Sequence, residues 1–206
     1  MKRMGVHYLG WFDSGIRFHL WSTKEMKTDA QGNLDVKGFK VRGNPIYNAF
    51  LTNFLGAQVL NMPSTDIYTA LERGTIEITG WTEIGIMDAN WDKHLKFRLD
   101  PKFFSTDLGV IINAKKWQSL QPKTREFLTK MAMEHEVASI GDMQQIRDRE
   151  IAELEKRGIK TFALGAEAGK RFIDGASAAA HARMKERMDK AGVPNDYDKV
   201  VKLFTP

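Results

Sequence analysis

Gly38-Phe-Lys-Val-Arg42-Gly-Asn-Pro45 opens the stretch that decides the fold, and Thr75-Ile-Glu-Ile-Thr79-Gly80-Trp81 closes it. Between them, short apolar runs alternate with two helical segments, 45–56 and 64–74. Helices that join short strands imply parallel strands connected by right-handed crossovers. The stretch therefore predicts a strand–helix–strand–helix–strand unit and an α/β fold class.

Turn and capping residues support these boundaries. Asn44 can cap a helix whose first position is Pro45, where a missing N–H costs nothing, and Ser64 can cap the next helix. Gly56 and Gly74 can end the two helices in the left-handed conformation that glycine adopts without steric penalty.

One edge of this unit gathers groups that favour an anion. Arg42 lies at the carboxyl end of the first strand and Trp81 at that of the third, and ligands of parallel sheets bind beyond this edge. The free N–H groups of the helix starts at Pro45 and Thr65 point the same way. The sequence thus predicts a site for a small anion such as a carboxylate.

Composition limits the alternatives. The chain has 206 residues, a net charge of +5 and no cysteine. Its basic residues are spread out, which disfavours nucleic-acid binding, and disulfides and thiolate chemistry are excluded. No apolar run approaches the ~20 residues that span a bilayer. Met1-Lys2-Arg3 resembles the start of a signal peptide, but no apolar segment follows, so we expect no export signal in the sequence as written.

The flanking segments extend this pattern. Residues 6–12 and 17–21 read as strands separated by a turn at 13–15, segment 24–37 reads as a solvated loop, and 82–91 predicts a short helix. Strict alternation over 95–100 predicts a half-buried strand, and the apolar run 107–113 predicts a strand covered on both faces.

The C-terminal third is predominantly helical. We expect helices over 114–120, 122–157 and 167–191, with a strand over 160–164. The apolar stripe of the long helix comprises Phe127, Met131, Val137, Ile140, Met143, Ile151 and Leu154. The first and last strands have too few partners, which predicts that an N-terminal part is missing.

Several motifs resemble one family closely: 10–17, 36–42, 61–74 and 107–120. They are similar to the solute-binding proteins of tripartite ATP-independent periplasmic (TRAP) transporters, and the resemblance runs from about Leu9 to about Ala191. It implies a two-lobed α/β fold like that of type II periplasmic binding proteins, here N-terminally incomplete and with long C-terminal helices.

The resemblance also implies a function. Such a receptor captures a small organic acid between its lobes and delivers it to membrane permease subunits, in the periplasm, without a cofactor and without enzymatic activity. We expect residues 1–13 to be a remnant of lobe I and the hinge, 14–100 to be lobe II, 101–163 to hold a hinge strand, the remaining lobe I strand and the long helix, and 164–206 to be a C-terminal helical segment.

The matched motifs assign ligand-binding residues. Arg42 takes the position of the family's carboxylate-clamping arginine, and Arg17 that of a second arginine that often contacts the ligand. Trp81, followed by Thr82, stands where many members place an asparagine and others an aromatic residue, and Glu77 replaces an aspartate of the preceding motif. The tryptophan suggests a ligand with an apolar or aromatic body.

Structural roles remain open for these arginines and for the aromatic residues. Arg42 could be an ordinary surface group and Arg17 part of a hinge salt bridge. The aromatic residues that could line the pocket, or simply form core, are Trp11, Phe12, Trp81, Phe103 and Phe104. At least one of the last two must be core, because adjacent strand residues face opposite ways.

Three functions stay open at this point. The five histidines show no metal-ligand spacing, so no metal is expected. A receptor for a small organic acid is the main hypothesis. An enzyme acting on such an acid would need a nucleophile–base pair that the sequence does not reveal, and a truncated chain without binding activity is the third possibility.

Overall fold

The structure is a computed structural model that describes residues 4–192 and 197–204. The strands are β1 Val6–Ser22, β2 Lys27–Thr28, β3 Leu34–Asp35, β4 Val41–Gly43, β5 Val59–Asn61, β6 Ile78–Thr82, β7 Phe97–Asp100, β8 Phe104–Asn113 and β9 Lys160–Ala163. The helices are α1 Ile67–Glu72, α2 Ala114–Ser119, α3 Pro122–Lys156, α4 Ala166–Lys190 and α5 Tyr197–Phe204. A π-helical turn, Phe50–Phe54, and 3-10 turns at Ser64–Asp66 and Trp91–Lys93 complete the elements.

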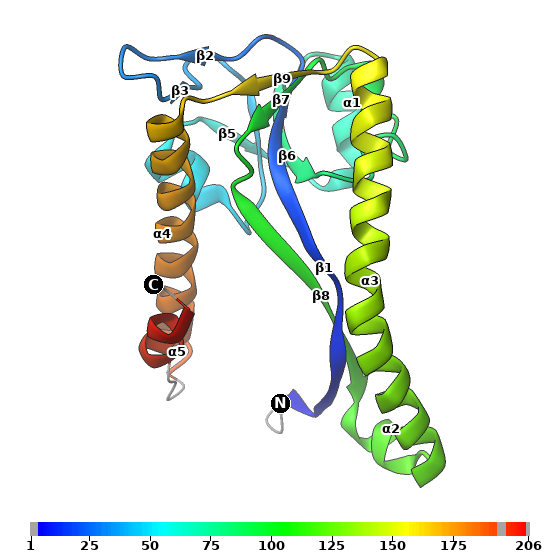
Figure 1. Cartoon of the computed structure of the whole chain (residues 1–206). Coiled ribbons are helices and arrows are strands. Elements are labelled where there is room, and N and C mark those ends of the chain that lie inside the picture. Colours follow the sequence, from blue (N-terminus) through cyan, green and yellow to red (C-terminus); the bar gives the residue numbers. More distant parts are fainter. Residues whose placement is uncertain (1–3, 193–196, 205–206) are drawn as a thin grey trace.

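Figure 1 shows two parts, which we call the body and the arm. The body surrounds the sheet ordered β5-β4-β6-β1-β7-β9. The arm comprises residues 6–16 of β1, β8, α2 and the N-terminal half of α3, and an open space separates it from α4 and α5. No helix in the described part has the length and apolar character needed to cross a membrane.

The predicted central unit is confirmed. β4 runs parallel to both β5 and β6 and lies between them. Gly56 and Gly74 have φ values of +66° and +64°, the left-handed conformation expected at the helix ends. The helical part of the first crossover is shorter than predicted, because residues 45–47 form a turn before the π-helical segment.

The turn predicted at 13–15 is wrong, because β1 is one strand of 17 residues. Its antiparallel pairing with β8 shifts register between Phe12 and Ile16, and Gly15 has a φ of +87°. Both flanking segments stay hydrogen-bonded to β8, so the extra residues form a bulge rather than a reversal of the chain.

Two apolar clusters cover opposite faces of the sheet. Leu20 of β1 packs into the first cluster with Phe50 and with Phe172 of α4, whereas the neighbouring Trp21 packs into the second with Trp91 and others. Successive strand residues face opposite ways, so β1 serves both clusters. The body therefore has a closed core on each side of its sheet.

Two predicted local structures are wrong within the body. Segment 24–37 is not a solvated loop: β2 and β3 pair as a small hairpin, and Met26, Leu34 and Val36 are buried in the first cluster. Residues 83–90 form turns instead of a helix.

The arm is open where the sequence predicts burial. β8 pairs only with β1 among the described strands, and its Leu108 and Ile111 are each 56% exposed. The prediction of a strand covered on both faces is therefore wrong.

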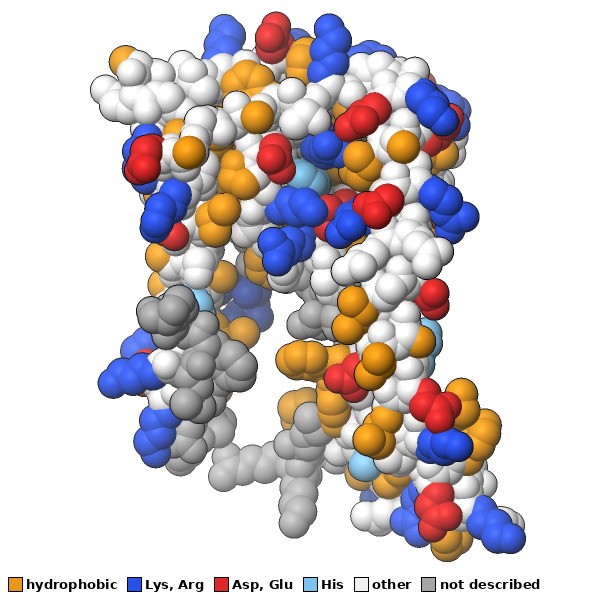
Figure 2. Space-filling model, viewed as in Figure 1, with side chains coloured by type: hydrophobic (Ala, Val, Ile, Leu, Met, Phe, Trp, Pro, Cys, Tyr) orange, Lys and Arg blue, Asp and Glu red, His pale blue; other side chains and the backbone are white. Residues whose placement is uncertain are grey.

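The predicted apolar stripe of α3 is also only partly buried: Leu154 is buried in the body, whereas Phe127 and Val137 are exposed on the arm. Figure 2 shows apolar side chains along the arm beside the open space.

Candidate functional site

Arg42 is the centre of the candidate site. Arg42 is the middle residue of the short strand β4 and is only 3% exposed. Nε and Nη2 donate to the carbonyl oxygen of Met62 at 3.2 and 3.0 Å, and Nη1 donates to the Tyr47 hydroxyl at 3.0 Å. These acceptors are neutral, and within the described ranges no carboxylate forms an ion pair with Arg42. The surface role considered for this arginine is excluded.

Tyr47 connects Arg42 to the neighbouring strand. Its hydroxyl donates to the carbonyl oxygen of Gly80 at 2.9 Å. A Cβ at Gly80 would lie 2.9 Å from the tyrosine ring, so glycine is what lets the ring approach β6 this closely. Burial raises the pKa of Tyr47, and the positive charge of Arg42 opposes that shift. Tyr47 therefore remains a neutral phenol that can both accept and donate hydrogen bonds.

An aromatic cluster surrounds Tyr47. The ring centroids of Phe18, Phe103 and Phe104 lie 5.9, 5.4 and 6.4 Å from that of Tyr47. Phe103 is buried and Phe104 is half-buried, as expected for adjacent strand residues that face opposite ways. Phe18 is also half-buried, so two of the four rings expose part of their surface. A slot of about 10 Å³ between this cluster and α4 has room for a single water at most.

Arg17 lies on β1 beside the cluster, with an exposed side chain. No described carboxylate pairs with its guanidinium, so the hinge salt bridge considered above is not formed there. Its backbone N–H donates to Glu83 Oε1 at 3.0 Å.

Glu83 is a buried carboxylate at the end of β6. Lys102 Nζ lies 2.5 Å from its Oε2 and His19 Nε2 lies 3.8 Å from the same oxygen. Burial raises the pKa of Glu83, but His19, Lys102 and the Arg17 N–H together outweigh burial and lower it to about 2. This carboxylate is therefore ionised and fully partnered, and it joins β1 and β6 to the segment that leads into β8.

Trp81 and Thr82 are half-buried on β6. The Trp81 ring packs edge-on against Trp91 at 4.7 Å, in the second apolar cluster. The Thr82 hydroxyl donates to the carbonyl oxygen of Ile84 at 2.5 Å. Both predicted site residues thus have internal partners.

Trp11 and Phe12 lie on the arm. Phe12 packs edge-on against His135 of α3 at 4.9 Å, and Trp11 is 51% exposed. At about 3.3 Å per strand residue, Trp11 stands roughly 20 Å along β1 from Phe18. The structure therefore links Phe104 to Arg42 through Tyr47, places Arg17 next to Phe18 on β1, and leaves Trp11 and Phe12 on the arm.

The helix starts expected to favour an anion are weaker than predicted. Residues 45–47 form a turn, in which Asn44 Oδ1 accepts the Ile46 N–H at 2.9 Å. Ser64 makes no capping hydrogen bond, and Asp66 places a negative charge in the first turn. The predicted cap at Ser64 is wrong.

Sequence reasoning missed Tyr47 and Phe18. Tyr47 lies two residues after Pro45 in a segment that reads as an ordinary helix start, and Phe18 lies on the same face of β1 as the core residues Ile16 and Leu20. Neither has a pattern that distinguishes it from a core residue. The described residues contain no group of three or more His, Cys, Asp or Glu that could hold a metal ion.

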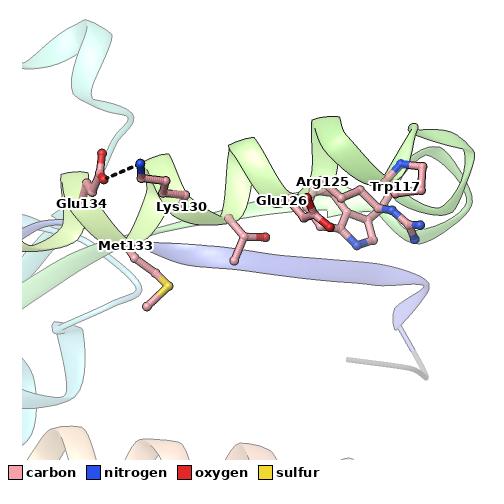
Figure 3. Close-up of a pocket in the computed structure, with 8 residues that line it drawn as sticks. Trp117, Arg125, Glu126, Lys130, Met133 and Glu134 are labelled. Carbon is pink, nitrogen blue, oxygen red and sulfur yellow. Dashed lines mark ion pairs between the residues drawn. The ribbon is translucent and has the colours of Figure 1, made fainter.

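A separate cavity of about 740 Å³ lies on the arm (Figure 3). Its lining includes Trp117, Arg125, Glu126, Lys130, Met133 and Glu134, and Lys130 pairs with Glu134 at 3.6 Å. The cavity lies along α2 and α3, remote from Arg42. It is a shallow surface hollow with no buried cation.

Comparison with known proteins places this geometry in a family. The chain matches the model of the family described as bacterial extracellular solute-binding protein, family 7 (DctP), over residues 1–187. The 2,3-diketo-L-gulonate-binding periplasmic protein of Escherichia coli K12 is 28% identical over 135 residues, which are 65% of this chain and 40% of that protein. A monocarboxylate 2-oxoacid-binding periplasmic protein of Nostoc is 25% identical over 152 residues, 71% of this chain and 40% of that protein.

Solved structures show the same fold. A TRAP periplasmic solute-binding protein from Haemophilus influenzae with bound L-gulonate has a TM-score of 0.77 at 17% identity, covering 100% of this chain and 65% of that one. One from Desulfovibrio salexigens with bound orotic acid has a TM-score of 0.78 at 18% identity, covering 97% and 61%. The α/β fold prediction is thereby confirmed, although the chain spans less than two thirds of these relatives. The chain belongs to family 7 of the bacterial extracellular solute-binding proteins, as the sequence resemblance predicted.

Proposed function

We propose that this chain is the solute-binding component of a TRAP transporter, in which Arg42 holds the carboxylate of a small organic acid. The observation that carries the proposal is a guanidinium, 3% exposed, that has no anionic partner in the described structure. An unpaired buried charge is strongly unfavourable, so a ligand carboxylate at this position offsets a cost that the folded chain otherwise bears.

The hydrogen bonds of Arg42 leave suitable donors for such a ligand. A guanidinium has five N–H groups, of which three serve Met62 and Tyr47. One N–H remains on each terminal nitrogen. Two donors on one planar group match the two oxygens of a carboxylate, whereas the ammonium group of a lysine would keep the charge and lose that geometry.

The chain provides one side of this site. We propose that the body corresponds to lobe II and the arm to the remnant of lobe I. The opposite wall would come from the portion that the longer relatives possess beyond the match. Support comes from the arm, where Trp11, Leu108 and Ile111 expose apolar surface of the kind that a second lobe buries.

Location and partners belong to the same proposal. The curated relatives are named as periplasmic binding proteins, and the structural relatives as TRAP solute-binding proteins. We propose that the ligand is captured in the periplasm and passed, chemically unchanged, to membrane permease subunits.

Isothermal titration calorimetry on the chain tests the clamp. Phenylacetate, pyruvate and D-glucuronate are titrated into the wild type, and we expect measurable binding of at least one. Arg42→Lys should then weaken the affinity about tenfold or more, because charge-assisted bonds contribute on the order of 1.5–3 kcal/mol.

Arg98→Lys is the matched control. Arg98 also bonds internally, to Thr161 Oγ1 at 3.0 Å and Glu155 at 3.6 Å, but lies on β7 away from the site. Equal affinities of Arg42→Lys and the wild type would refute the clamp. A cooperative thermal melt without binding of any acid would instead identify the chain as a folded fragment without receptor activity, a second candidate that the exposed arm favours.

A further inference from the structure

We infer that the site selects a carboxylate attached to a flat apolar ring in preference to a polyhydroxylated acid. This inference rests on the proposed function, and it specifies the chemistry of the ligand body beyond the carboxylate. Among the structural relatives, one was solved with orotic acid and another with L-gulonate. A flat ring and a polyhydroxylated chain need different walls around a carboxylate clamp.

The first observation is the position of the aromatic cluster. Tyr47 contacts Arg42 through its hydroxyl, and its ring lies next to Phe18 and Phe104. A ligand whose carboxylate is held by Arg42 therefore meets rings directly beyond the clamp. Phe18 and Phe104 are half-buried, so part of each ring is available for contact, and Ile46 adds an exposed apolar side chain nearby.

The second observation is that the polar side chains of this edge are already occupied. The Tyr47 hydroxyl donates to Gly80, the Thr82 hydroxyl donates to Ile84, and Asn48 Nδ2 donates to Asn61 Oδ1 at 2.7 Å. Two exceptions remain: Asn48 Oδ1 is buried without a partner in the described structure, and Arg17, next to Phe18 on β1, has an exposed side chain that pairs with no described carboxylate. Beyond these two residues the edge offers no described side-chain partners to the four or five hydroxyls of a polyhydroxylated acid.

These observations together favour an aromatic acid over a polyhydroxylated acid. Hydroxyl groups that lose water without finding partners weaken binding, whereas an aromatic ring gains by packing edge-on or offset against other rings. Phe104 is accordingly the residue that should determine this preference, because it combines partial exposure with a direct ring contact to Phe18 at 5.6 Å.

Calorimetry with phenylacetate and D-glucuronate tests the inference on the whole chain. Both probes carry one carboxylate, so the clamp contributes to each. We expect phenylacetate to bind about tenfold more tightly or better. Phe104→Asn should reduce the ratio of affinities at least threefold, whereas Phe127→Asn, which alters an exposed phenylalanine on α3, should leave the ratio unchanged.

The outcomes separate this inference from the function on which it rests. Equal or tighter binding of D-glucuronate by the wild type would overturn the ring preference and leave the carboxylate clamp intact. Binding of neither probe, with no response to pyruvate, would overturn both. Because the ratio is measured on the wild type, the result does not depend on how well the Phe104 variant folds.

Discussion

The body and the arm share their longest strand but differ in what covers it. In the body, Leu20 and Trp21 are completely buried on opposite faces of β1. In the arm, Trp11 of the same strand is 51% exposed. Both regions have regular secondary structure, so hydrogen bonding does not distinguish them. The difference teaches that the body buries this strand on both faces, whereas the arm leaves apolar side chains of the same strand exposed.

The largest expected effect comes from two tryptophans of β1. Trp21→Ala removes a fully buried side chain and should lower the free energy of unfolding by about 3–5 kcal/mol. Trp11→Ala should cost less than about 1 kcal/mol, because half of its side chain already faces water. Urea denaturation measures both values. Equal losses would show that the arm is packed as tightly as the body.

Two carboxylates, one in the body and one on the arm, allow the same comparison for ion pairs. Glu83→Gln breaks a buried pair with Lys102 and should cost about 3–5 kcal/mol. On the arm, Glu134→Gln removes an exposed pair with Lys130 and should change stability by less than about 1 kcal/mol. Chemical denaturation at pH 7 measures the difference between the two variants.

The pH dependence of stability provides a check on Glu83. Its pKa in the folded state, about 2, lies below the ordinary value of 4.5. The unfolded state therefore binds a proton first as the pH falls, and the contribution of Glu83 to stability is present above pH 4.5 and lost towards pH 2. The loss is on the order of 3 kcal/mol. A stability profile of Glu83→Gln as steep as that of the wild type over this range would contradict the assignment.

A smaller effect is expected at two glycines. Gly80→Ala drives a Cβ to 2.9 Å from the rigid Tyr47 ring and should cost about 1–3 kcal/mol, while also weakening carboxylate binding. Gly109→Ala on the arm brings a Cβ to 3.2 Å from Tyr8, and its cost should be a fraction of that value. Thermal denaturation compares the two variants. A larger loss at Gly109 would place the tighter packing in the arm.

The smallest stability effect is expected on α3. Val137 is 73% exposed, so Val137→Lys should change the free energy of unfolding by no more than about 0.5 kcal/mol. It should nevertheless reduce the fluorescence of the dye ANS, which binds exposed apolar surface. Unchanged dye binding would show that this face of the helix is not an apolar docking surface.

The contrast between the body and the arm also explains which parts of the fold could be predicted from the sequence. The parallel direction of the strands around β4 and the lengths of α3 and α4 followed from periodicity and from glycine and proline positions, which act locally. The apolar run of β8 predicted burial on both faces, which was wrong: burial needs a partner, and none of the described elements covers Leu108 and Ile111. Pattern reasoning cannot see which partner a face has.

Prediction of the site was limited for a related reason. Arg42 could be proposed as a site residue from the sequence, because strand ends and family motifs are visible there. Tyr47 could not, because its position depends on contacts that the sequence does not show: its ring packs closely against Gly80, 33 positions away, and it shares the Arg42 guanidinium with the Met62 carbonyl. Trp81 was matched to a ligand position, yet its ring lies against Trp91, a contact that neither residue reveals in sequence.

The continuity of β1 has a mechanical consequence. Phe18 is paired at once with Thr82 of β6 and with Phe104 of β8, so it marks the point where the ribbon leaves the sheet. Beyond it, β1 and β8 continue as a two-stranded ribbon that carries the bulge at Gly15 and packs against α3. A rotation of the arm about Phe18 would therefore act on Phe18 and Phe104, whose rings lie next to Tyr47.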